Sequence, residues 1–137
     1  MWRRERILKG LLKYQLPPLF WIFVIFVLSS IPRLPTVLGV PEGADKIGHA
    51  FLFFILCWLS WRALFYQPHF PLMSRYALLG AFIFTVVYGL LDEFHQRFVP
   101  GRTSDIYDVM ADAGGALLFA VIAWMMRRPP PENEQTE

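Results

Sequence analysis

The chain has 137 residues, of which 55% are hydrophobic and 18% charged, and its mean hydropathy is +0.41. A soluble domain of this size cannot bury so much apolar surface, so we expect lipid to cover most of it. The formal charge is only +2, and the basic residues are clustered, which indicates membrane topology rather than nucleic-acid binding. Cys57 has no second cysteine to pair with, so an intramolecular disulfide is excluded.

Four apolar runs, bounded by Pro, Gly or charged residues, follow one another along the chain. Each is near the length of about 20 residues that a bilayer crossing requires. The sequence therefore predicts an all-α, polytopic membrane four-helix bundle. Its expected spans are residues 16–31, 45–65, 73–93 and 106–126.

The distribution of Lys and Arg predicts the orientation of these spans. The apolar runs themselves cover residues 16–31, 47–61, 76–91 and 113–126. Nine of the 13 basic residues lie before the first run, between the second and third, or after the fourth, and four lie between the first and second or between the third and fourth. Because basic residues concentrate on the cytoplasmic side, we expect both termini in the cytoplasm of a multi-pass protein of the bacterial cytoplasmic (inner) membrane. Residues 1–15 are then a basic cytoplasmic N-terminus, 16–128 the membrane domain and 129–137 a disordered cytoplasmic tail.

Ionisable residues gather at the predicted non-cytoplasmic ends of three spans. The fourth apolar run is too short to cross unless its helix begins near Asp105 and carries Asp108 and Asp112 below the interface. These three acids share one helical face, as do Asp45 and His49, and Asp92 and Gln96. Buried carboxylates are costly unless they find partners, so a common polar cavity is expected.

Each polar residue also has a structural interpretation. Lys46 or Arg102 can simply neutralise an aspartate. Ser104 or Asp105 can cap the fourth helix, and Gly114 and Gly115 suit close helix packing as well as ligand approach. Taken together, the number of acids exceeds what ion pairing requires, which favours a functional site. Its candidate residues are Asp45, Lys46, His49, Asp92, Glu93, His95, Gln96, Arg102, Asp105, Asp108 and Asp112.

Three motifs in this region resemble those of the VanZ-like family of small membrane proteins. They are Asp45-Lys46-Ile47-Gly48-His49, Asp92-Glu93-Phe94-His95-Gln96, and Pro100-Gly101-Arg102 followed by Asp108. The resemblance covers about residues 45–119. It implies a membrane protein of four or five helices, and the founding member is associated with raised tolerance to the glycopeptide antibiotic teicoplanin. It implies no settled biochemical activity.

One functional hypothesis is an enzyme acting on envelope lipid head groups or lipid-linked cell-wall intermediates. His49, Asp92, Glu93 and Asp108 are its candidate catalytic residues. The remaining candidates would bind substrate, with Lys46 and Arg102 contacting phosphate. Oxygen and imidazole ligands make a divalent cation possible, although no tight metal motif is present and the metal is unknown.

The alternative is a non-catalytic membrane factor that binds an envelope lipid or a glycopeptide in envelope maintenance or antibiotic tolerance. Such a factor needs the same cavity and cations but no pair of residues that exchange protons with a substrate. A proton or ion path ranks last, because the opposite halves of the spans carry no ionisable relay. Membrane lipids are the expected partners under every hypothesis, and nucleic acid is not expected.

Overall fold

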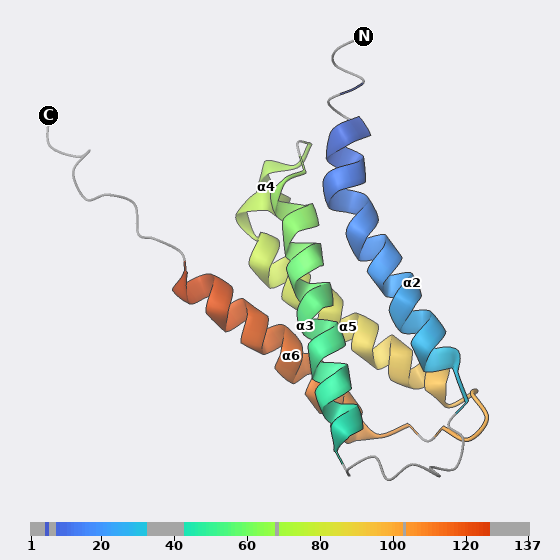
Figure 1. The fold of residues 1–137 in the computed structure, drawn as a ribbon. Coiled ribbons are helices and arrows are strands. Elements are labelled where there is room, and N and C mark those ends of the chain that lie inside the picture. Colours follow the sequence, from blue (N-terminus) through green and yellow to red (C-terminus); the bar gives the residue numbers. More distant parts are fainter. Residues whose placement is uncertain (1–4, 6–7, 33–42, 68, 103, 127–137) are drawn as a thin grey trace, which may run out of the picture.

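A computed structural model describes residues 5, 8–32, 43–67, 69–102 and 104–126, and these residues form helices and turns without any strand (Figure 1). Four helices are long and apolar enough to cross a membrane, which confirms the predicted all-α membrane bundle. The predicted tail, 129–137, lies outside the described residues. In chain order the elements are η1 (Leu11–Gln15), α2 (Leu16–Ser30), α3 (Ala44–Phe65), α4 (Pro71–Arg75), α5 (Ala77–Gln96) and α6 (Ile106–Met125).

The first and third spans begin at different residues from those expected. The first helix long and apolar enough to span a membrane runs over Leu8–Ser30, so residues 8–15 are helical and continuous with it. Their cytoplasmic location stays a prediction. A turn of π-helix at Leu11–Gln15 precedes the two prolines at the start of α2. The third span begins at Ala77, because Pro71 starts a separate short helix, α4, that ends at Arg75.

Local residue chemistry fixes the helix ends near the polar region. Gly43 precedes α3 with a φ of 91°, and Gly101 has a φ of 74° in the turn between α5 and α6, a backbone region that favours glycine. Asp105 caps α6 by accepting a hydrogen bond of 2.9 Å from the backbone N–H of Tyr107. The predicted start of the fourth helix is therefore correct, and Asp108 and Asp112 lie within it.

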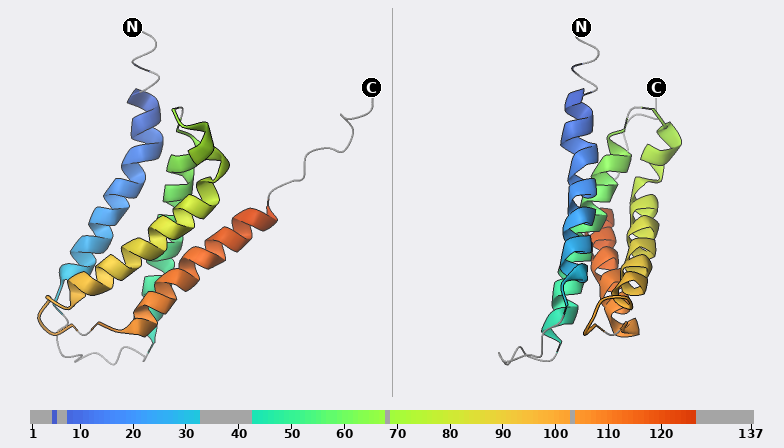
Figure 2. Two further views of the ribbon diagram at one scale, coloured as in Figure 1. Left: turned by 180° about the vertical axis from the view of Figure 1, so that it is seen from behind. Right: turned by 90° about the vertical axis from the view of Figure 1, so that its right-hand side faces the viewer.

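Helix α3 packs against α5 and α6, and α2 lies along the edge of the bundle in contact with α3 and α5 (Figure 2). Cys57, Ala81, Ala116 and Phe119 form the core between α3, α5 and α6. A second cluster of Ile25, Phe53 and Leu56 joins α2 to α3. Large apolar side chains cover the outer faces, as expected of helices that contact lipid.

Four helix ends meet at one end of this bundle. The C-terminal ends of α2 and α5 and the N-terminal ends of α3 and α6 come together there (Figure 1). The predicted polar residues belong to these ends. Which side of a membrane this end faces stays a prediction from the basic residues.

Candidate functional site

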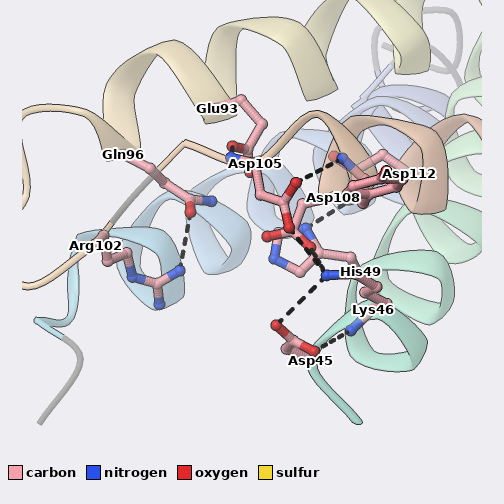
Figure 3. A network of polar contacts seen from close by, with 10 residues as sticks. Asp45, Lys46, His49, Glu93, Gln96, Arg102, Asp105, Asp108 and Asp112 are labelled. Carbon is pink, nitrogen blue, oxygen red and sulfur yellow. Dashed lines mark hydrogen bonds and ion pairs between the residues drawn. The ribbon is translucent and has the colours of Figure 1, made fainter. Parts of the chain in front are cut away.

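Lys46, on the first turn of α3, contacts two acids of the α6 region. Its Nζ atom lies 3.1 Å from Asp105 Oδ2 and 3.2 Å from Asp108 Oδ1, and 4.0 Å from Asp45 Oδ2 (Figure 3). Asp108 is buried, whereas 38% of the Lys46 side chain is exposed. The hydrogen bonds from Tyr107 and Lys46 lower the pKa of the Asp105 carboxyl below its usual value. Lys46 therefore pairs with acids of the α6 region, as the structural interpretation of the sequence expects.

His49, one turn further along α3, pairs with Asp112 of α6. His49 Nδ1 lies 3.0 Å from Asp112 Oδ1, and Asp112 is only 1% exposed. When Asp112 is ionised its carboxylate can only accept, so Nδ1 donates, and in a neutral imidazole the lone pair is then on Nε2.

Two glycines make this pairing possible. A Cβ atom at Gly89 of α5 would lie 3.0 Å from Asp112 Oδ2, so the glycine leaves room for the carboxylate. A Cβ atom at Gly115 would lie 1.9 Å from the carbonyl oxygen of Ala50, so the backbones of α6 and α3 are in direct contact next to the pair.

Asp92 of α5 accepts hydrogen bonds from two uncharged side chains. Its Oδ2 atom accepts hydrogen bonds of 2.8 Å from Ser29 Oγ of α2 and from Gln96 Nε2. Gln96 in turn accepts a bond of 3.1 Å from Arg102, whose guanidinium also donates to the carbonyl oxygens of Leu28 and Ile31 at the end of α2. Arg102 thus fixes the end of α2 and is linked to Asp92 through Gln96.

Glu93, the neighbour of Asp92, is 3% exposed. Its Oε2 atom accepts a hydrogen bond of 3.0 Å from the backbone N–H of Asp105. Its Oε1 atom is buried and has no hydrogen-bond partner among the described residues. An unpaired buried carboxylate oxygen is costly, so this atom is suited to bind a ligand or to carry a proton.

A cavity of about 210 Å³ lies between α2, α3 and α5 at this end of the bundle. One part of its wall is apolar, and the other is formed by Ser29, Asp45, His49, Asp92 and Arg102. His49, Asp92 and Glu93 each offer one ligand atom, and these atoms lie within 4.8 Å of one another. This group is suited to hold a metal ion or to activate a water molecule.

The model of the VanZ/LLP1 family matches residues 2–127. The chain belongs to the VanZ/LLP1 family. The match includes the first membrane span, which the three motifs of the sequence did not cover. No curated protein and no solved structure matches the chain.

In this VanZ/LLP1 protein, ten of the eleven candidate residues form three hydrogen-bonded or ion-paired groups at the polar end, and the groups approach one another at His49, Asp92 and Glu93. We call these ten residues the polar network. His95 is the exception, because its ring lies 4.8 Å from that of Phe26 and its Nε2 atom lies 3.0 Å from Ser30 Oγ. Its side chain therefore faces α2 and does not border the cavity. The role of every candidate residue stays a prediction.

Sequence reasoning missed Ser29 and Gly89 in the VanZ/LLP1 site. Ser29 ends an apolar run, and its buried hydroxyl contacts a residue 63 positions away. Gly89 lies inside an apolar run. Although Gly89 lies only three residues before Asp92, a small residue in an apolar run gives no signal until the packing of α5 on α6 is known.

Proposed function

We propose that the protein is an enzyme that hydrolyses a phosphate ester or anhydride in the head group of an envelope lipid. The cavity carries this proposal, because it combines the Arg102 guanidinium, the His49 and Asp92 side chains, and an apolar wall of α2 and α3 residues. Guanidinium groups bind phosphate oxygens well, and the apolar wall suits the start of a lipid chain. Ionisable groups at membrane depth mark functional sites by default.

The size of the cavity narrows the class of ligand. At about 210 Å³ it is smaller than the roughly 300–1,000 Å³ of sites for drug-sized molecules. It therefore suits a phosphate head group and not a whole lipid or a glycopeptide. In the reaction, a water oxygen gives a proton to the site and bonds to phosphorus, and the bond from phosphorus to the lipid-side oxygen breaks. The lipid-side oxygen takes up a proton, and inorganic phosphate is released.

The residues have three roles in this proposal. His49, Asp92 and Glu93 activate the attacking water, since they converge beside the cavity. Arg102 binds the phosphate oxygens. Lys46 and Asp108 hold α3 and α6 together beneath the site, and Asp112 orients His49. A lipid-linked cell-wall intermediate presented from the outer leaflet fits the predicted orientation.

The test is mass spectrometry of an envelope lipid extract incubated with the purified protein, together with a colorimetric assay of released phosphate. Wild type and Glu93→Gln are compared, with Glu5→Gln as the matched control because Glu5 is exposed and outside the site. We expect a dephosphorylated lipid with wild type and Glu5→Gln, and at least a 100-fold lower rate with Glu93→Gln.

An extract left unchanged by wild type would contradict the enzymatic proposal. A lipid that then co-purified with wild type but not with Arg102→Ala would support the non-catalytic binding factor instead. Equal turnover by wild type and Glu93→Gln would place the chemistry outside this site.

A further inference from the structure

Among the described residues of the polar end, acids outnumber Lys and Arg side chains. Lys46 contacts three of these acids, Asp45, Asp105 and Asp108. Asp92 and Glu93 are 4% and 3% exposed, and within the described part of the chain neither has a Lys or Arg partner at ion-pair distance. Two adjacent buried carboxylates of this kind require two compensating positive charges or protons.

The carboxylates and His49 are positioned in the way that metal ligands are. Each has one polar atom fixed by a neighbour: His49 Nδ1 by Asp112, Asp92 Oδ2 by Ser29 and Gln96, and Glu93 Oε2 by the backbone of Asp105. In known metal sites, hydrogen bonds of this kind orient the ligands. A histidine ligand commonly donates from its second ring nitrogen to a carboxylate.

These contacts leave one atom of each residue able to bind a metal. These atoms are His49 Nε2 and one oxygen each of Asp92 and Glu93, and the Glu93 Oε1 atom is buried without a partner among the residues described. The three side chains bring ligand atoms within 4.8 Å of one another, close enough for small side-chain rotations to bring them around one ion.

We propose that His49, Asp92 and Glu93 bind one divalent metal ion at the edge of the cavity. One imidazole with two carboxylates favours Zn²⁺ or Mn²⁺ over Ca²⁺, which prefers oxygen ligands alone. The ion supplies the two positive charges that Asp92 and Glu93 lack. The proposal deepens the proposed function, because such an ion would activate water and polarise a phosphoryl oxygen beside Arg102. His49 is then a ligand, oriented by Asp112.

The test is metal binding by the purified full-length protein in detergent, after removal of any polyhistidine tag and treatment with chelator. Zn²⁺ and Mn²⁺ are titrated separately by calorimetry, and bound metal is counted by mass spectrometry after dialysis. We expect one ion per chain for at least one of the two metals. His49→Gln and Glu93→Gln should each weaken its binding at least 100-fold.

Matched controls and a second type of variant make the result specific. His69→Gln and Glu5→Gln replace an exposed histidine and glutamate outside the site and should bind the metal as wild type does. Asp112→Asn keeps all three ligands but changes the group that orients His49, so it should weaken binding about 10- to 100-fold. Asp112→Asn therefore still tests the proposal if a substitution of one of the three ligands prevents folding.

The absence of saturable binding of both metals to wild type would overturn the proposal, and protons would then neutralise Asp92 and Glu93. Equal affinity in wild type, His49→Gln and Glu93→Gln would overturn it as well. The outcome is separate from that of the lipid assay. If the protein binds the ion but leaves the lipid extract unchanged, the metal site is supported and the proposed reaction is contradicted. If the protein turns over lipid without metal, the reaction is supported and the metal site is contradicted.

Discussion

Lys46 provides the only cation within ion-pair distance of buried Asp108 among the residues that the structure describes. Replacing Lys46 by Gln would leave this carboxylate buried without a positive charge, which is destabilising. We expect Lys46→Gln to lower the thermal midpoint of the protein in detergent, followed by tryptophan fluorescence. Arg97→Gln is the matched control, because Arg97 is exposed and outside the network, and it should leave the midpoint unchanged.

A double-mutant cycle separates this ion pair from a general loss of packing. Asp108→Asn removes the charge that Lys46 neutralises, so the Lys46→Gln and Asp108→Asn double variant should lose less stability than the two single losses added together. Simple additivity would show that the two residues do not interact in the folded protein.

At the level of single residues, the sequence predicted which side chains belong to the polar end but not how they pair. The spacing of Asp105, Asp108 and Asp112 placed them on one face of α6, because helical periodicity alone decides that. His95 lies only one position from Gln96, yet faces α2. That difference depends on how α5 is rotated against its neighbours, which local spacing does not fix.

The contact between α3 and α6 determines the geometry of the site at the level of whole elements. Gly115 of α6 lies against the Ala50 carbonyl of α3, where an added Cβ would be 1.9 Å from that oxygen. Ala50 follows His49, and Gly115 lies three residues after Asp112. The same close approach therefore brings His49 and Asp112 to hydrogen-bond distance.

Gly115→Ala should consequently force α3 and α6 apart, because a backbone atom cannot rotate away as a side chain can. We expect a loss of about 1–3 kcal/mol or more in stability, the usual range for overpacking. Thermal unfolding in detergent provides the measurement.

The neighbouring glycine is the natural control for this substitution. A Cβ atom at Gly114 would meet nothing within 4 Å, and alanine favours helices over glycine by about 1 kcal/mol. Gly114→Ala should therefore leave the midpoint unchanged or raise it. Equal destabilisation by both variants would contradict the close contact between α3 and α6. The sequence alone left the roles of the two glycines open, since only the rotation of α6 distinguishes them.

The helices themselves were largely predictable, because length and hydropathy identify a bilayer crossing. Their ends were less so. The helix before Leu16 contains Lys9 and Lys13, whose charges made residues 8–15 look like a separate segment. Long basic side chains can extend from a helix end toward the interface, so they do not terminate the helix. Helix α4 was missed because five residues show no periodicity.

The whole molecule has two chemically different ends. The polar network occupies the end where α3 and α6 begin, and Arg62 and Arg75 lie toward the other, near the connection between α3 and α5. The positive-inside bias predicts that the arginine end is cytoplasmic and that the cavity opens toward the outer leaflet. This orientation decides which lipid pool the protein can reach.

Cysteine labelling tests the orientation directly. Cys57 is buried, and Cys57→Ala provides a background without thiols. In that background Ser104→Cys reports on the polar end and His69→Cys on the opposite end, since both positions are exposed. We expect a membrane-impermeant maleimide to label Ser104→Cys in spheroplasts, and His69→Cys only after lysis. The reverse pattern would place the cavity at the cytoplasmic leaflet, and its substrate would then have to be a lipid phosphate made available inside the cell.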